Sequence, residues 1–179
     1  MTVDREGLTG RVLGLGAYAA GLIPVAEVPF ERSFLSLCES NACGRYGRSW
    51  MCPPAVGKID ELIAQAAAYQ WMLVYQRVDL LEDSFDIEGM LEAGRRMNRL
   101  CEQVREALRG LLPGALYLGA GGCRVCESCA YPEPCRFPEK AIPSLEAYGV
   151  AVSELAARAG MRYTNGENTV TYFGAVLFD

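Results

Sequence analysis

The sequence predicts an α/β fold in which helices pack on a mixed sheet. Apolar runs rich in β-branched and aromatic residues alternate along the chain with segments of helical periodicity. Strands separated by helices are typical of layered α/β proteins. Hydrophobic residues make up 51% of the 179 residues, enough to bury one sizeable core. We therefore expect a single domain over residues 1–179, with two cysteine-rich loops, at about 38–57 and 119–143, at one end of the sheet.

The N-terminal half predicts two helices and two strands. Residues 8–20 read as a helix weakened by glycines, and residues 22–28 as a short strand. The compact apolar run 71–78 predicts a buried strand. A helix before it is indicated by four apolar residues at helical spacing: Ile59, Leu62, Ile63 and Ala66.

The longest predicted helix follows Asp86, a suitable N-cap residue, and ends before Pro113-Gly114. Charged residues occupy its other faces, so one side is expected to face the core. The residues on that side are Ile87, Met90, Leu91, Gly94, Met97, Cys101, Val104 and Leu108.

The C-terminal part predicts two further strands around one helical segment. Residues 115–118 form a short strand, and the β-branched and aromatic run 169–178 forms the last one. Residues 144–159 are expected to be helical, with a break near Gly149.

Charge and leader patterns exclude several classes of protein. The formal net charge of −5 argues against a nucleic-acid-binding surface, which would be basic. Residues 1–10 are polar where a secretory leader would become apolar, and the apolar stretch 12–28 is interrupted by glycines and prolines, so we expect neither export nor a membrane span. A cytoplasmic location follows, and thiols stay reduced there. Eight cysteines then indicate metal ligation rather than disulfides.

The strongest motif is the second cysteine loop, Cys123-x2-Cys126-x2-Cys129-x5-Cys135. Consecutive Cys-x2-Cys steps followed by a fourth cysteine are typical of a [4Fe–4S] cluster. The preceding segment, 119–122, is glycine-rich and could direct backbone N–H groups at a cofactor. The alternative is a zinc site with four cysteine ligands, although zinc sites usually separate two Cys-x2-Cys pairs by a longer stretch.

The first loop carries three cysteines, Cys38, Cys43 and Cys52, and ends in Pro53-Pro54. A long loop in a compact domain needs a reason, and a second metal site supplies one. The alternative is three loosely buried thiols.

Three thiolates leave the fourth corner of the first site open. Cys101 is the remaining cysteine, but its place on the apolar side of the long helix favours a core residue. Asn41, Glu39 and Tyr46 could also line the corner, although turn or surface roles suit them better. An open corner could bind water, a substrate or another small-molecule ligand.

Basic and aromatic residues near the cysteines could tune such centres. Arg124 and Arg136 could offset the negative charge of a thiolate-ligated cluster and raise its reduction potential. Arg45 and Arg48 could balance charge or bind an anion at the first site, or form a solvated loop face. Trp50 is expected to shield a metal centre from water.

These motifs together resemble a prokaryotic family of cysteine-rich predicted metal-binding proteins of unknown function. Three segments, spanning most of the chain, carry the resemblance: 41–54, 121–138 and 143–149. The resemblance implies metal binding at the seven loop cysteines and implies no particular reaction.

Three functions remain open on the sequence. The first is an iron–sulfur protein that transfers electrons to or from a redox partner protein. The second is an enzyme that binds its substrate at an open-cornered cluster. The third is a zinc-stapled structural or interaction module. The absence of histidine excludes a Cys–His nucleophilic pair.

Overall fold

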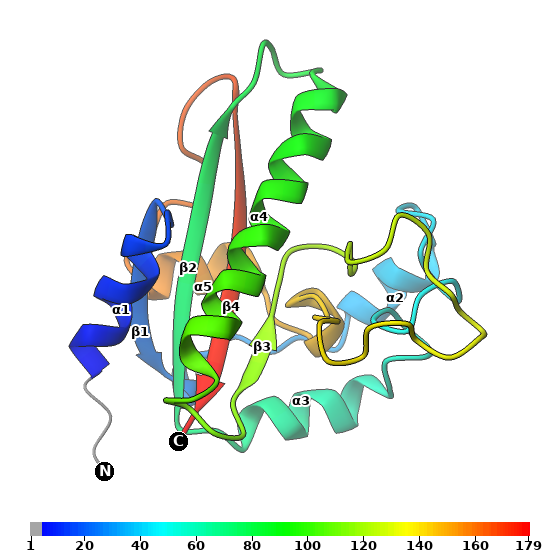
Figure 1. Cartoon of the computed structure of the whole chain (residues 1–179), viewed down its shortest axis with the longest axis horizontal. Helices are drawn as coiled ribbons and strands as arrows, with labels where there is room; N and C mark the ends of the chain where they lie inside the picture. Colours follow the sequence, from blue (N-terminus) through cyan, green and yellow to red (C-terminus); the bar gives the residue numbers. More distant parts are fainter. Residues whose placement is uncertain (1–4) are drawn as a thin grey trace.

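A four-stranded antiparallel sheet forms the centre of the computed structural model, which describes residues 5–179, with side chains from residue 7 onward. Residues 1–4 of the polar N-terminal segment lie outside the described part. The strands are β1 (Ala19–Pro24), β2 (Trp71–Leu80), β3 (Leu116–Leu118) and β4 (Thr169–Phe178). They stand side by side in the order β1-β2-β4-β3 (Figure 1).

The predicted α/β class is confirmed, but the sheet is not mixed: neighbouring named strands all pair antiparallel. The sheet is antiparallel because β4 lies between β2 and β3. Helix α4 (Ile87–Leu108) returns the chain across the sheet, so that β3 runs in the same direction as β2. The last strand of the chain then occupies the space between them, and each neighbour of β4 is antiparallel to it.

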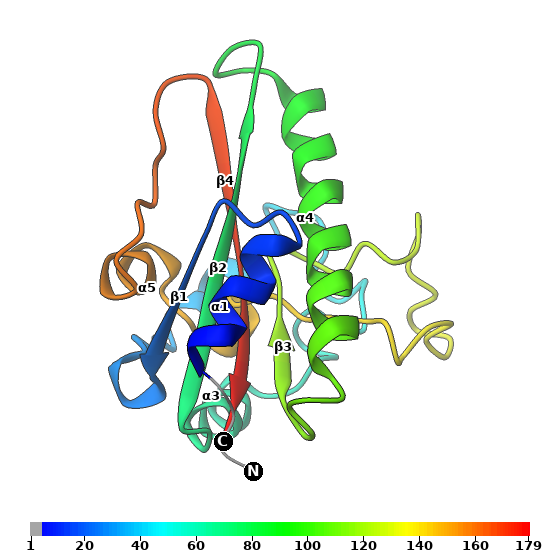
Figure 2. The same ribbon diagram turned by 60° about the vertical axis from the view of Figure 1, so that its left-hand side comes forward.

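Helices cover both faces of the sheet (Figure 2). Helix α1 (Arg5–Gly14) and α4 pack on one face. The opposite face is covered by α3 (Ile59–Ala67), α5 (Val152–Arg158) and the short 3-10 helix η2 (Glu146–Tyr148). Another 3-10 helix, η1 (Val25–Glu27), follows β1, and α2 (Phe34–Glu39) leads into the first cysteine loop.

Strand β2 divides its side chains between the two cores. Met72 and Val74 are buried on the α3–α5 side, and Leu73 and Tyr75 are buried on the α1–α4 side. This alternation is the period of two that a strand imposes. Because both faces are covered, the strand reads as a continuous apolar run in the sequence.

Helix α4 confirms the predicted start. The Asp86 carboxylate accepts a hydrogen bond from the Gly89 N–H at 2.8 Å, as an N-cap residue does. The central part of the predicted apolar side, from Met97 onward, is buried against the sheet. The first two turns are different, since Ile87 is 68% exposed and Leu91 is 41% exposed. These turns lie near the end of the helix that projects beyond the core (Figure 1).

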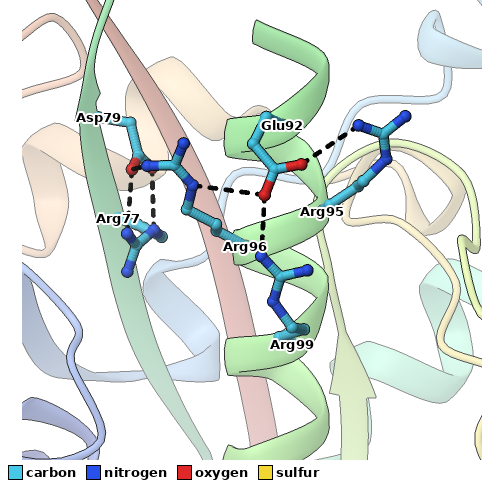
Figure 3. A network of polar contacts seen from close by, with 6 residues as sticks. All are labelled: Arg77, Asp79, Glu92, Arg95, Arg96 and Arg99. Atoms are coloured by element: carbon cyan, nitrogen blue, oxygen red, sulfur yellow. Dashed lines mark hydrogen bonds and ion pairs between the residues drawn. The ribbon is translucent and has the colours of Figure 1, made fainter. Parts of the chain in front are cut away.

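A network of charges joins α4 to β2 (Figure 3). The buried Asp79 carboxylate accepts two hydrogen bonds from Arg77 at 2.9 Å and one from Arg96 on α4 at 3.0 Å. Nearer the solvent, Glu92 pairs with three arginines of its own helix: Arg95, Arg96 and Arg99. The buried carboxylate thus links the helix to the sheet.

The N-terminal boundaries differ from prediction. The helix expected over 8–20 ends at Gly14, and the strand expected over 22–28 begins at Ala19 and ends at Pro24. Gly16 has φ +102°, a conformation that stops a helix and that glycine adopts without strain. The chain then turns into a strand that pairs with β2, so tertiary pairing overrides the local helical signal.

The C-terminal predictions are confirmed in outline. The break near Gly149 is real, with φ +71° at that residue, and it separates η2 from α5. The last strand spans Thr169–Phe178 as expected. No helix in the described range 5–179 is both long and apolar enough to cross a membrane.

Candidate metal centre

The two cysteine loops lie against each other beside the β3 edge of the sheet (Figure 1). This differs from the expected position at one end of the sheet: the second loop follows the short edge strand β3, whereas the first loop lies between α2 and α3. The Arg45 guanidinium donates to the Cys123 carbonyl at 3.1 Å, and the Trp50 indole N–H donates to the Glu133 carbonyl at 2.7 Å. A side chain on Gly122 would meet the Cys52 sulfur at 3.3 Å. Sixty-one residues, 58–118, separate the two loops in the sequence, yet the loops contact each other.

The first loop is folded by local turns. Cys38 lies in the last turn of α2. The Asn41 side-chain oxygen accepts from the Tyr46 N–H at 3.0 Å, so this residue serves the turn rather than an open metal corner. The Gly47 N–H donates to the Pro53 carbonyl at 2.9 Å and closes the loop. These contacts support the turn role that the sequence favoured for Asn41.

The Cys43 and Cys52 thiols of the first loop act electrostatically on the third thiol, Cys38. Burial raises the pKa of the Cys38 thiol, and the neighbouring Cys43 and Cys52 thiols raise it further. Burial also raises the pKa of Cys52, against the effects of the Ser49 hydroxyl and the Arg45 guanidinium. Three thiolates so placed repel one another, and a bound cation would remove that cost.

All four cysteines of the second loop line one small hollow. The first loop contributes to the same hollow through Ser49, Trp50 and Met51. The remaining lining residues are Cys123, Val125, Cys126, Cys129, Ala130, Cys135, Arg136, Phe137 and Ala141. The Trp50 ring also packs edge-on against Tyr131, with centroids 5.1 Å apart. Trp50 therefore shields the second site, although the sequence places it in the first loop.

Hydrogen-bond donors surround the sulfur of Cys129. Burial opposes ionisation of this thiol, but the backbone N–H groups of Tyr131, Trp50 and Ala130 and the Ser49 hydroxyl outweigh it. The pKa of Cys129 consequently lies below its usual value. Donors of this kind stabilise a thiolate ligand and tune the potential of an iron–sulfur cluster.

Cys123 is more buried, and burial raises its pKa while N–H groups of Val125 and Ile142 act in the opposite sense. The expected role of the glycine-rich segment 119–122 needs correction at its first residue. The Gly119 N–H donates to the Pro143 carbonyl at 2.8 Å, so it holds the loop closed and is not free to face a cofactor.

The arginines take different positions. Arg124 lies against Gly94 of α4, and burial, followed by Arg45 and Arg95, lowers its pKa. Arg136 lines the hollow of the second site and donates to the Ser128 carbonyl at 3.3 Å. Arg45 sits between the two loops. These positive charges would partly balance thiolate ligands.

Cys101 lies away from both loops, in the core between α4 and the sheet. Its side chain is in hydrogen-bond contact with the Tyr75 hydroxyl, and burial raises its pKa to about 11. The sequence-based interpretation of Cys101 as a core residue is confirmed. Cys101 therefore does not join the three cysteines of the first loop.

A residue that the sequence did not single out lies beside the first site. Glu146 is in η2, which packs against α2. Its charge contributes to the raised pKa of Cys38. Burial raises the pKa of Glu146 itself, and one carboxylate oxygen, Oε2, is buried without a hydrogen-bond partner. No sequence pattern could have identified Glu146, because this glutamate does not belong to a motif of regularly spaced ligands.

All eight cysteines are free thiols. Within residues 5–179, no three Cys, Asp or Glu side chains are gathered closely enough to hold a single metal ion. A tetrahedral zinc site would need its sulfur atoms about 3.8 Å apart, given bonds of about 2.3 Å. A cluster of several iron atoms takes more widely spaced thiolates.

Comparison with known proteins gives one family. A family model described as "Predicted metal-binding protein (DUF2284)" matches residues 21–178. Searches of curated proteins and of solved structures gave no match. The matched range contains both loops and Glu146.

Proposed function

The chain belongs to the DUF2284 family of predicted metal-binding proteins, and from that premise we propose that it is an iron–sulfur protein with a redox role. A [4Fe–4S] cluster is held by Cys123, Cys126, Cys129 and Cys135. A second metal centre is held by the three cysteines of the first loop. When bound, such clusters accept and release single electrons.

One observation carries the proposal: the four cysteines of the second loop line a single hollow. The surrounding groups support iron–sulfur over zinc. Backbone N–H groups of Tyr131, Trp50 and Ala130 are directed at the Cys129 sulfur. A structural zinc site needs only its four ligands to staple a loop, whereas donors to sulfur and a covering aromatic ring affect potential and solvent access.

The closeness of the loops supports electron transfer between the two centres. The Cys123 thiol of the second loop contributes to the raised pKa of Cys52 in the first, and Gly122 lies against the Cys52 sulfur. Arg45 bridges the loops through the Cys123 carbonyl. In this proposal a reduced one-electron carrier, a protein or a small molecule, donates an electron at one centre. The other centre passes it to an acceptor, in the reducing cytoplasm.

The test is the metal and sulfide content of protein purified without oxygen, measured beside its visible spectrum. About eight iron and eight sulfide per chain support two cubane clusters, and about four of each support one. Zinc without sulfide would overturn the redox proposal and leave a structural module.

A matched pair of cysteine variants assigns the cluster. Cys129→Ser should lose the iron of the second site and its charge-transfer absorption. Cys101→Ser makes the same substitution at a core position outside both loops, and this variant should keep the iron and the charge-transfer absorption. Equal iron loss in the two variants would show that the content reflects folding rather than ligation.

A further inference from the structure

Beside the cysteine-lined hollow, two adjoining hollows follow helix α4. The larger has a volume of about 430 Å³ and reaches Tyr117 of β3. The smaller is bounded by Asn98 of α4 and by Cys123 of the second loop. Glu102 and Lys140 line both hollows, so the two form one continuous groove, which we call the α4 groove.

Two buried polar atoms of the α4 groove lack a partner. The Tyr117 hydroxyl lines the larger hollow and the Asn98 Nδ2 the smaller, and both are buried without a hydrogen-bond partner in the described range 5–179. Each atom can donate a hydrogen bond, and a buried donor left unsatisfied costs free energy. A ligand that carries acceptors at two points would satisfy both donors.

An arginine accompanies each of these donors. Burial raises the pKa of Tyr117, and the nearby Arg105 guanidinium acts in the opposite sense. Arg124 lines the smaller hollow together with Asn98. Both arginines are half-buried, and neither forms an ion pair with another residue in the part of the chain that the structure describes. Each hollow therefore offers a guanidinium and an unsatisfied donor to the same ligand.

The charges of the groove favour carboxylates over phosphate as the acceptor. Its charged lining comprises four basic and three acidic side chains: Arg105, Arg109, Arg124, Lys140, Glu102, Glu106 and Glu139. Within this set Arg109 already pairs with Glu106 at 2.6 Å. The remaining excess is basic, in a chain of formal net charge −5. A guanidinium matches a planar carboxylate, whereas the higher charge of a phosphate would be repelled by Glu102 and Glu139.

We propose that the α4 groove binds a small organic dicarboxylate. One carboxylate pairs with Arg105 and accepts a hydrogen bond from the Tyr117 hydroxyl. The other pairs with Arg124 and accepts from Asn98 Nδ2, at the end of the groove that Cys123 closes. The volume of the larger hollow is in the range of small-molecule sites. This inference goes beyond the proposed function and does not require a metal.

The experiment measures the binding of succinate, glutarate and adipate to the full chain, purified without oxygen, by isothermal titration calorimetry. Succinamide, the uncharged diamide of succinate, and inorganic phosphate are the comparison ligands. At least one dicarboxylate should bind, roughly tenfold or more tightly than succinamide and phosphate, because charge-assisted hydrogen bonds are the stronger ones. Three chain lengths are used so that one of them spans the two donor sets.

Three variants locate the site. Tyr117→Phe removes only the hydroxyl and should weaken binding roughly tenfold. Its Tm should be unchanged or higher, because the free protein gives that hydroxyl no partner; a purely structural hydroxyl would lower Tm instead. Arg105→Gln should weaken binding at least as much. Arg99→Gln is the matched control, because Arg99 lies on the same helix, pairs with Glu92 and lines neither hollow, so its affinity should equal that of the wild type.

The outcomes separate this inference from the proposed function. No binding of any dicarboxylate, equal binding of succinamide or tighter binding of phosphate overturns the dicarboxylate site. Unchanged affinity in Tyr117→Phe and Arg105→Gln also overturns it, and if Arg105→Gln fails to fold, Tyr117→Phe alone decides. Dicarboxylate binding by a chain that never holds iron supports the site and overturns the proposed function. An iron-loaded chain that binds no dicarboxylate gives the reverse result.

Discussion

Replacing Asp79 by asparagine should destabilise the fold without removing metal. The carboxylate side chain is 5% exposed and accepts three hydrogen bonds at 2.9–3.0 Å from two arginines. Asparagine has one acceptor oxygen, and its NH2 group would face guanidinium N–H donors. Hydrogen bonds to charged groups contribute about 1.5–3 kcal/mol each. The Arg77 and Arg96 side chains, however, are 27% and 43% exposed and can turn to water.

The expected net loss is about 2–3 kcal/mol, below the full cost of breaking a wholly buried pair. For a chain of this length, that loss lowers Tm by about 5–10 °C. The assay is thermal unfolding of anaerobically purified protein, followed by circular dichroism, with iron content measured in parallel. Iron per chain should stay at the wild-type value, since Asp79 lies on β2 and outside both loops.

Glu92→Gln is the matched control, because it removes a carboxylate of the same network at a side chain that is 39% exposed. Exposed ion pairs contribute little, so its Tm should stay within experimental error of the wild type. Equal Tm values for Asp79→Asn and Glu92→Gln would refute the reasoning that burial sets the strength of this network. A loss of iron in Asp79→Asn would refute the separation between network and metal loops.

Three further predictions concern the loops and the core. Trp50→Ala should uncover the second site, so that its visible absorption bleaches faster in air. The bleaching rate of Trp50→Phe should lie between those of the wild type and Trp50→Ala. An unchanged rate in Trp50→Ala would contradict the shielding role. Burial raises the pKa of Cys101 to about 11, so the unfolded chain loses this proton at lower pH than the folded chain. The free energy of unfolding should therefore fall between about pH 9 and 11 more in wild type than in Cys101→Ala, as urea titrations would show. A side chain on Gly122 would lie 2.5 Å from the Arg45 side chain, so Gly122→Ala should displace that arginine and shift the reduction potential of the second centre. Gly14→Ala, at a position with open space, should leave the potential unchanged.

The fold was predictable where local chemistry and tertiary packing agree. The 87–108 helix has a cap, a charged face and an apolar face, and β4 has the residues that a buried strand prefers. The region before Pro24 was not predictable from local patterns, because residues whose local pattern favours a helix instead pair with β2 as a strand. The order of strands was equally hidden, since the insertion of β4 depends on packing between distant segments.

The candidate site divides in the same way. Spacing identified the seven loop cysteines, because ligands within one loop must follow each other at short intervals. Spacing could not show that Trp50 reaches the second hollow or that Glu146 lies beside Cys38. Those positions arise from how the loops and η2 pack, and no local pattern encodes them.

Because Trp50 crosses from the first loop to the hollow of the second, neither loop is a self-sufficient module. A peptide copied from residues 119–143 would lack the indole that meets Tyr131 and donates to the Glu133 carbonyl. Natural selection then acts on the two segments as a pair. Among relatives, replacements at positions 50 and 131 should occur together, and transplanting the second loop into another scaffold should require the first loop to travel with it.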